Sequence, residues 1–486
     1  MTMAVNMPRP AMTSHQGVSG VGLPWPALLY LLCVVLPLWM NLGPIKLSVL
    51  RILLLAITVP LLVQVLMGRF GRVMAIDLLM IAHTIWIGVA LYVNNPGQMV
   101  TQVGSVGLEF LGGYLVARAY VRTPEAFIAL CRWILLIVVL LLPFALIETQ
   151  TGYPPLVQIL KALPVIDTVP IVHQEKRMGL DRAQVVFVHP IHFGLFCSIS
   201  VALVFVALKD VVSTPVRWGG AILSGMAGFL ALSSGALLAI ALQVALIGWA
   251  SLFHRIRWRW WLLVGLFAMA WVAIDLLSNR SPMRVFMSYA TFSAHNAYWR
   301  SIIFEWGMKS VWAHPLYGIG LNDWVRPDFM FSGSMDNFWL VMAVRYGIPG
   351  FLCVAGAYVL GVFQVMRRSF DEDATLRHIR RAWVFIMLGL AFTLATVHVW
   401  ATIYSFVFFM FGAGLWLAGA TPRDDRSHGD TATDGDPSDA SPGHARGRVR
   451  AGATSTSRNG LQFRRFETVT PAHRRPREAP SVPEHP

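Results

Sequence analysis

Residues 333–350 read GSMDNFWLVMAVRYGIPG, and this stretch decides how the chain is expected to fold. Its centre is apolar enough for a membrane helix, yet it opens on Asp336 and Asn337 and carries Arg345 further in. A cation at that depth in an apolar helix costs roughly 2.5 to 3.5 kcal/mol. We therefore expect a negatively charged or hydroxyl-rich partner for this helix, and we expect Asp336 to be its N-cap.

The composition around this stretch excludes a soluble globular protein. Only 13% of the 486 residues are charged, against roughly 25% in soluble domains. The four cysteines lie inside apolar runs and predict neither a disulfide framework nor a metal site. The net charge of +14 lies mainly before residue 421, which favours lipid and substrate phosphates over nucleic acid as partners.

Apolar runs of about 17 to 25 residues predict an all-α polytopic membrane protein with about twelve transmembrane helices. Residues 1–24 are expected to be a cytoplasmic N-terminal segment, 25–420 the transmembrane domain, and 421–486 a disordered cytoplasmic tail. The runs lie near 25–43, 46–67, 74–93, 102–121, 125–147, 189–208, 217–232, 235–253, 260–278, 337–361, 383–400 and 402–420.

Arginine and lysine recur in alternate short loops, which all lie on one side of the membrane if the predicted spans alternate. By the positive-inside rule this side is cytoplasmic. Both termini are then inside. The opposite, external side carries two long segments, about 148–188 and 279–336. Long ordered loops are usually functional. Within the second one, the spacing of apolar residues over 296–312 predicts an interfacial helix with Tyr298, Ile302, Ile303, Trp306 and Val311 broadly on one side.

Basic residues recur in both external segments and need a partner of opposite charge. The planar guanidinium of arginine matches phosphate oxygens in a bidentate manner. We therefore expect these side chains to bind a diphosphate at the membrane edge. The candidates are Arg177, Arg182, Arg280, Arg284, Arg300, Arg326 and, from the helix after the loop, Arg345.

The order of four motifs resembles a known family. RMGLDRAQVVFVHPIHFG precedes a span, a hairpin runs through LSSGALLAI, and YWRSIIFEWGMKSVWAHPLYGIG is followed by DNFWLVMAVRYGIPG. This set is similar to the O-antigen ligase and polysaccharide polymerase family of bacterial inner membranes. The resemblance covers most of residues 45–420.

The resemblance implies glycosyl transfer at the periplasmic face without a metal or other cofactor. The donor would be an oligosaccharide on undecaprenyl diphosphate. The acceptor would be a second such lipid in a polymerase, or a lipid A core in a ligase. Membrane lipids, a chain-length regulator and export proteins are the further partners to consider. The family's His-Asn pair stands here as Asp336-Asn337, and Ser233-Ser234 replaces an arginine common in ligases. Both departures favour a polymerase, most plausibly of an exopolysaccharide.

Glycosyl transfer also needs a group that takes the proton of the attacking hydroxyl. Asp336, His295 and His314 are the candidates, although the carboxylate also suits an N-cap and each histidine also suits a structural role. Arg345 could instead form an intramembrane ion pair, and Glu109 is a candidate partner for Arg51 or Arg345. The competing functions are a ligase, a transporter or flippase for lipid-linked sugars, and a non-catalytic scaffold of a secretion complex.

Overall fold

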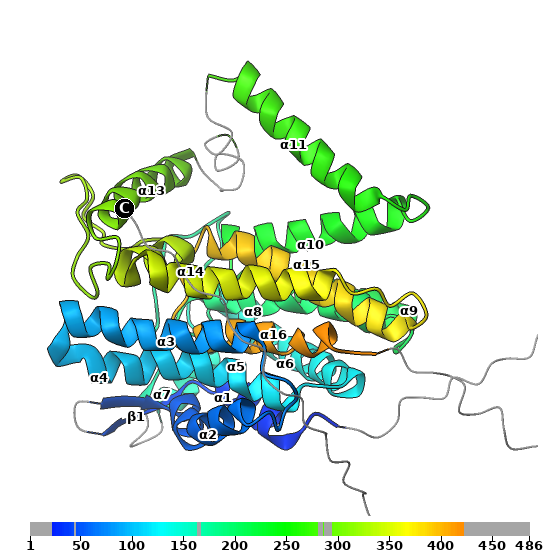
Figure 1. The fold of residues 1–486 in the computed structure, drawn as a ribbon, viewed down its shortest axis with the longest axis horizontal. Coiled ribbons are helices and arrows are strands. Elements are labelled where there is room, and N and C mark those ends of the chain that lie inside the picture. Colours follow the sequence, from blue (N-terminus) through cyan, green and yellow to red (C-terminus); the bar gives the residue numbers. More distant parts are fainter. Residues whose placement is uncertain (1–21, 43–44, 163–166, 280–284, 286–293, 422–486) are drawn as a thin grey trace, which may run out of the picture. The chain divides into compact units, whose positions relative to one another are not determined.

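A computed structural model of the protein describes residues 22–42, 45–162, 167–279, 285 and 294–421. Helices dominate this part of the chain (Figure 1). They are α1 Trp25–Val35, α2 Val49–Leu66, α3 Ala75–Asn94, η1 Pro96–Gln98, α4 Met99–Gln102, η2 Val103–Gly107, α5 Leu108–Tyr120, α6 Pro124–Thr151, α7 Pro155–Lys161, α8 Pro190–Ala202, η3 Leu203–Ala207, α9 Thr214–Leu230, α10 Ser234–Leu252, α11 Arg259–Leu277, α13 Ala294–Ala313, α14 Phe338–Met366, α15 Ala374–Leu394, α16 Ala401–Gly412 and η4 Leu415–Ala418.

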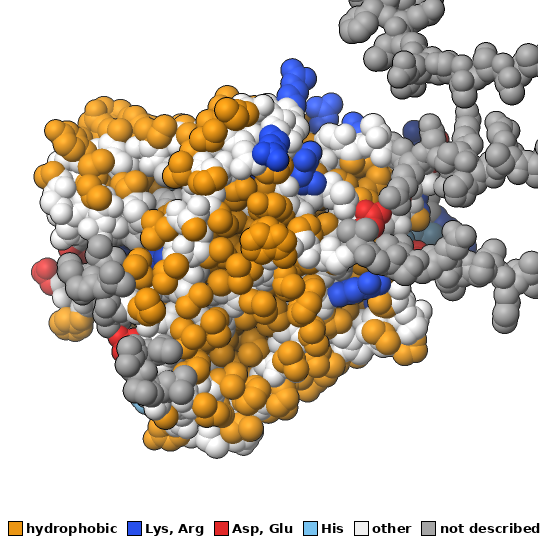
Figure 2. All heavy atoms as spheres, turned by 90° about the horizontal axis from the view of Figure 1, so that it is seen from below, with side chains coloured by type: hydrophobic (Ala, Val, Ile, Leu, Met, Phe, Trp, Pro, Cys, Tyr) orange, Lys and Arg blue, Asp and Glu red, His pale blue; other side chains and the backbone are white. Residues whose placement is uncertain are grey.

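Eight helical segments in the described part are long and apolar enough to cross a membrane. The protein is therefore a mostly helical, multi-pass membrane protein, and twelve spans stay a prediction. Apolar side chains cover a broad band of one face, with Lys and Arg gathered toward one end of it (Figure 2). The eight segments are Val49–Leu66, Ala75–Asn94, Pro124–Thr151, Pro190–Ala207, Ser234–Leu252, Arg259–Leu277, Phe338–Met366 and Ala401–Ala418.

The first apolar run does not form the single helix predicted over 25–43. Its helix, α1, stops at Val35 after 11 residues, which is too short to span a bilayer. Leu36 takes an extended conformation because it precedes Pro37. The chain continues into a small antiparallel sheet of order β2-β1-β3, formed by β1 Leu38–Leu42, β2 Ile45–Ser48 and β3 Asp167–Thr168. The fold is mostly helical, consistent with the all-α prediction, and this small sheet is a local addition that the sequence did not predict.

Helix α14 is broken at Gly347, whose φ of 73° and ψ of 177° are not helical. It consists of a short arm, residues 338–346, and a long arm, residues 348–366. Trp339 and Tyr358 lie on different arms with ring centroids 5.4 Å apart. In a straight helix these two residues would be about 28 Å apart along the axis. The short arm therefore folds back against the long arm.

The break leaves backbone amides and carbonyls of α14 without helical partners, and the segment 315–320 forms hydrogen bonds with them. The carbonyls of Val344 and Arg345 each accept an amide, from Ile319 and Gly320 respectively, at 2.9 Å. In the reverse direction, the Ile348 amide donates to the Pro315 carbonyl at 2.7 Å. Irregular backbone in a membrane protein is tolerated where such partners exist. The turn of α14 is thus held in place by hydrogen bonds to the segment 315–320.

This turn changes where Arg345 lies. Gly320, which bonds to the Arg345 carbonyl, also packs against Asn94 and Asn95 at the end of α3. The Arg345 side chain is exposed. The expectation of a continuous helix is therefore wrong, because the helix breaks at Gly347, two residues after Arg345. The depth of Arg345 in the membrane stays a prediction.

Glu109 has a partner of opposite charge. The Nε atom of Arg51 donates to Glu109 Oε1 at 2.8 Å, and the Glu109 side chain is buried. Of the two partners considered from the sequence, the structure selects Arg51. A second buried pair joins Arg118 to Asp77 at 3.2 Å. Arg118 also donates to the carbonyls of Phe70 and Arg72, so this pair holds the α2–α3 connection.

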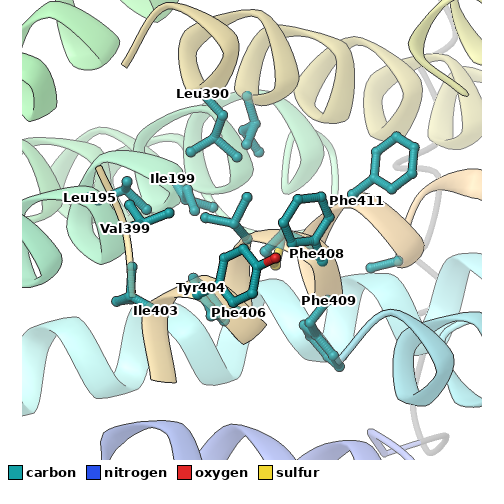
Figure 3. Close-up of a cluster of buried hydrophobic side chains, with 14 of the residues drawn as sticks. Leu195, Ile199, Leu390, Val399, Ile403, Tyr404, Phe406, Phe408, Phe409 and Phe411 are labelled. Carbon is teal, nitrogen blue, oxygen red and sulfur yellow. The ribbon is translucent and has the colours of Figure 1, made fainter. Parts of the chain in front are cut away.

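An apolar cluster from α8, α15 and α16 lies inside the bundle (Figure 3). Phe338, the first residue of the short arm, is fully buried against Tyr404 and Phe408 of this cluster, with ring centroids 6.0 and 6.1 Å away. The start of α14 is therefore anchored in the helical core. The two polar residues just before it, Asp336 and Asn337, are partly buried.

Candidate functional site

The segment between α7 and α8 is held against α6 by a carboxylate. Glu148, in the last turn of α6, accepts hydrogen bonds from the amides of Gln184 at 2.9 Å and Val185 at 2.8 Å. The Gln184 side chain in turn accepts the Val172 amide at 2.8 Å. These bonds fix the backbone on both sides of the stretch that carries Arg177 and Arg182.

Both of these arginines reach the hairpin between α9 and α10. Arg177 begins a tight turn, bonded to Leu180 in both directions at 3.0 Å. Its Nη1 donates to the Leu232 carbonyl at 2.7 Å. Arg182 Nε donates to the Ala231 carbonyl at 3.3 Å. Two guanidinium groups from one loop thus converge on the end of α9.

Arg300 approaches the same hairpin from α13. Its Nη2 lies 3.4 Å from Ser234 Oγ, while its Nη1 is buried and has no hydrogen-bond partner among the described residues. Helix α13 packs on α14, where Gly307 faces Leu340, and buries Ile302 and Ile303 as predicted. The helix itself is confirmed, and its interfacial position stays a prediction. Tyr298 is 60% exposed and does not belong to its packed face.

The N-cap of α14 is Asn337, whose Oδ1 accepts the Leu340 amide at 3.1 Å. The expectation that Asp336 caps this helix is therefore wrong. Asp336 instead accepts a hydrogen bond from Ser334 Oγ at 3.0 Å. Its charge acts on both Arg182 and Arg300. The Asp336 carboxylate therefore does not cap the helix, and it lies close to Arg182 and Arg300.

We call Arg177, Arg182, Arg300 and Asp336 the arginine cluster. Three cations against one carboxylate leave a formal charge of +2. Burial lowers the pKa of all three arginines, and that of Arg182 falls to about 10 because the charge of Arg177 adds to the effect of burial. Asp336 opposes this lowering for Arg182 and Arg300. A partly buried cluster with surplus positive charge suits an anion with several oxygens.

A histidine that was not among the predicted site residues borders this cluster. His189 caps α8 through Nδ1, which accepts the Ile191 amide at 3.1 Å, and its Nε2 contacts the Gln174 side chain. Gln174 in turn contacts Arg182. Burial, followed by the charges of Arg182 and Arg177, lowers the pKa of His189 to about 4. Its ring is therefore neutral at pH 7.

The other predicted site residues do not join the cluster. Arg326 pairs with Asp323 at 2.5 Å and donates to the Met330 carbonyl at 2.9 Å, within its own loop. His314 is exposed at the far end of α13, about 21 Å from Arg300 along the helix axis. His295 lies on α13, but its side chain is outside the described residues, as are Arg280 and Arg284.

Comparison with protein families identifies the region that holds part of this cluster. Residues 219–355 match the model of the O-antigen ligase family. This part of the chain is similar to that family, and for this reason we refer to residues 219–355 as the ligase domain. The ligase domain runs from α9 into the long arm of α14 and includes the α9–α10 hairpin, Arg300, Asp336 and Arg345. No curated protein matches the chain.

The ligase domain supports a general role in ligase- or polymerase-type processing of lipid-linked glycans. Arg177 and Arg182 lie before the matched residues. They nevertheless bond to the hairpin of the ligase domain, next to Ser233 and Ser234, where the resemblance leads one to expect an arginine. In this chain the positive charge at the hairpin therefore comes from Arg177 and Arg182 in the α7–α8 segment and from Arg300 in α13.

Proposed function

We propose that this protein polymerises oligosaccharide repeat units carried on undecaprenyl diphosphate, during exopolysaccharide or O-antigen synthesis. The reaction would take place at the periplasmic face of the bacterial inner membrane, with both termini in the cytoplasm. One observation carries the proposal: three arginines from two separate segments converge on the hairpin of the ligase domain.

The arginine cluster suits the donor diphosphate. As the bond between the anomeric carbon and the diphosphate oxygen breaks, negative charge grows on the leaving group. Arg177, Arg182 and Arg300 are held by backbone or side-chain partners, so they stabilise this charge without first rearranging. Arg300 Nη1, which lacks a partner among the described residues, is a donor available to a phosphate oxygen.

Asp336 suits the acceptor side of the same reaction. An acceptor hydroxyl forms the new bond to the anomeric carbon and gives its proton to the carboxylate, which later releases it to water. General base assistance of this kind contributes about 10²- to 10⁴-fold. Asn337 supplies the helix cap, so Asp336 can change its protonation state without unfolding the start of α14.

Purified full-length protein in nanodiscs, given a synthetic oligosaccharide on undecaprenyl diphosphate, tests the proposal. We expect lipid-linked products one or more repeat units longer, formed equally in the presence of EDTA. A ligase is the second candidate because the matched family is described as one. Transfer only to an added lipid A core would establish that activity instead. Movement of the lipid across vesicle membranes without new glycosidic bonds would indicate a flippase and overturn the proposal.

A further inference from the structure

Gln174 lies in a row of hydrogen-bonding groups that runs from the start of α8 to the arginine cluster. At the first contact, the Ile191 amide meets Nδ1 of His189 at 3.1 Å. At the second, His189 Nε2 meets Nε2 of Gln174 at 2.6 Å. At the third, Gln174 Oε1 meets Nη1 of Arg182. Each contact is close enough to require a donor on one side and an acceptor on the other.

The chemistry of the four groups does not allow this at all three contacts. The Ile191 amide and the Arg182 guanidinium, at the two ends of the row, can only donate. A neutral His189 ring has one N–H and one acceptor nitrogen, and the Gln174 amide presents one donor and one acceptor. Rotating the Gln174 amide by 180°, or moving the His189 proton to its other nitrogen, only transfers the mismatch to another contact. A second proton on His189 would add one more donor. The row therefore lacks one acceptor.

Neighbouring contacts keep these groups together. Arg182 also donates through Nε to the α9–α10 hairpin at 3.3 Å. The His189 ring packs against Trp400, with ring centroids 5.6 Å apart. The amide of Val172, two residues before Gln174, is bonded to a side chain of its own segment at 2.8 Å. Two donors that face each other without an acceptor cost free energy, so a row held in this state indicates a place for an added acceptor.

We propose that an oxygen of the donor diphosphate lies between Gln174 and Arg182, which makes Gln174 a further diphosphate-binding residue. This inference rests on the proposed function. In the bound state the Gln174 amide is rotated, and its Nε2 and Arg182 Nη1 both donate to the phosphate oxygen, which accepts several hydrogen bonds. Gln174 Oε1 then accepts the Nε2–H of His189, while His189 Nδ1 still accepts the Ile191 amide. Every contact in the row now joins a donor to an acceptor.

The proposal requires that stability and lipid affinity change in opposite directions. Gln174→Met keeps the size of the side chain, removes the mismatch from the ligand-free protein and removes one hydrogen bond from the complex. Its unfolding temperature should therefore be unchanged or higher, whereas its affinity for undecaprenyl diphosphate should fall roughly 10-fold or more. In Gln174→Glu the carboxylate accepts from both Arg182 and His189, so the unfolding temperature should rise and the lipid should bind more weakly still.

Gln184 provides a matched control in the same segment. Its Oε1 accepts the Val172 amide at 2.8 Å, and its Nε2 donates to the carbonyls of Pro170 and Phe187, both at 3.0 Å. Each of these bonds joins a donor to an acceptor. Gln184→Met should therefore lower the unfolding temperature, although it is the same substitution as Gln174→Met.

Thermal unfolding and lipid binding of the full-length protein in phosphatidylcholine nanodiscs test the inference. Gln174→Met should weaken the binding of undecaprenyl diphosphate and leave that of phosphatidylglycerol unchanged. Equal losses for the two lipids would show a general phospholipid contact and contradict the diphosphate assignment. Full affinity in Gln174→Met, or an unfolding temperature lowered as in Gln184→Met, would overturn the inference and leave the proposed function intact. Failure of the unmodified protein to bind undecaprenyl diphosphate would overturn the proposed function itself.

Discussion

Trp339 packs against Tyr358 although the two residues lie on opposite sides of the break in α14, with ring centroids 5.4 Å apart. Each ring also reaches α15: Trp339 Nε1 donates to the Ala391 carbonyl at 3.1 Å, and Tyr358 Oη donates to that of Met387 at 2.6 Å. The two arms of α14 are therefore fixed to one neighbour. This arrangement places Asp336 and Arg345 at opposite ends of the short arm.

Gly347→Ala should be strongly destabilising. The backbone there has positive φ, and an added Cβ would overlap the Leu316 carbonyl. We expect a loss of about 3 kcal/mol or more in the free energy of unfolding, measured by thermal unfolding in detergent. Gly356→Ala, in the long arm with open space around it, should be neutral or stabilising by up to about 1 kcal/mol. Equal behaviour of the two variants would contradict the described turn.

Arg300→Gln should reduce glycan transfer while leaving the fold intact. Loss of a hydrogen bond from a charged group costs about 1.5–3 kcal/mol, which corresponds to a roughly 10- to 150-fold lower rate. Lys309→Gln removes a charge from the same helix, but its side chain is exposed and pairs only with Glu305 among the described ion pairs, so its rate should be unchanged. Similar losses in both variants would show that α13 acts only through its overall charge.

Asp336→Asn and Asn337→Ala should separate catalysis from helix capping. Asp336→Asn should slow transfer by about 10²- to 10⁴-fold with an unchanged unfolding temperature. Asn337→Ala removes the side chain that accepts the Leu340 amide and should cost about 1 kcal/mol of stability. Full activity of Asp336→Asn, with polymer of normal length, would remove Asp336 from the mechanism.

His189 should make stability depend on pH. Its pKa is about 4 in the folded protein, below the ordinary value of about 6.5. Between these values the unfolded chain binds more protons, so stability falls as pH is lowered from about 6.5 toward 4. His189→Asn keeps a capping side chain for α8 but cannot titrate.

The matching measurement is the free energy of unfolding against pH for that variant. Its slope over this interval should be smaller than in the unmodified protein, by up to about 1.4 kcal/mol per pH unit. His254→Gln, at an exposed histidine between α10 and α11, serves as the control substitution. An unchanged slope in His189→Asn would show that its ring titrates normally.

The sequence predicted most helices because apolar runs of span length have few alternative structures in a membrane protein. It also provided Arg51 as a partner for Glu109. It did not predict the break in α14, although YGIPG contains a signal: Ile348 precedes Pro349, which disfavours a helical conformation there. The length of the apolar run outweighed that signal, and one continuous helix was therefore predicted.

For the site, the sequence provided Arg177, Arg182, Arg300 and Asp336 as candidates, and the structure brings them together. It predicted Asp336 as the cap where the structure has Asn337, because both residue types cap helices well. It gave no signal for Gln174, a single glutamine in a polar stretch. Nor did it predict the contact between Trp339 and Tyr358 across the break in α14, because no local pattern encodes how the two arms pack.

The start of the short arm rests on the aromatic cluster of α8, α15 and α16. Helix α16 begins a candidate span that continues through η4 to Ala418. Water drawn toward the proposed charged reaction centre at one end of this span would weaken the electrical insulation between the two compartments. The rings of Phe406, Phe408 and Phe409 restore it by excluding water. Their replacement by smaller or polar side chains should therefore let protons leak across the membrane and dissipate its potential.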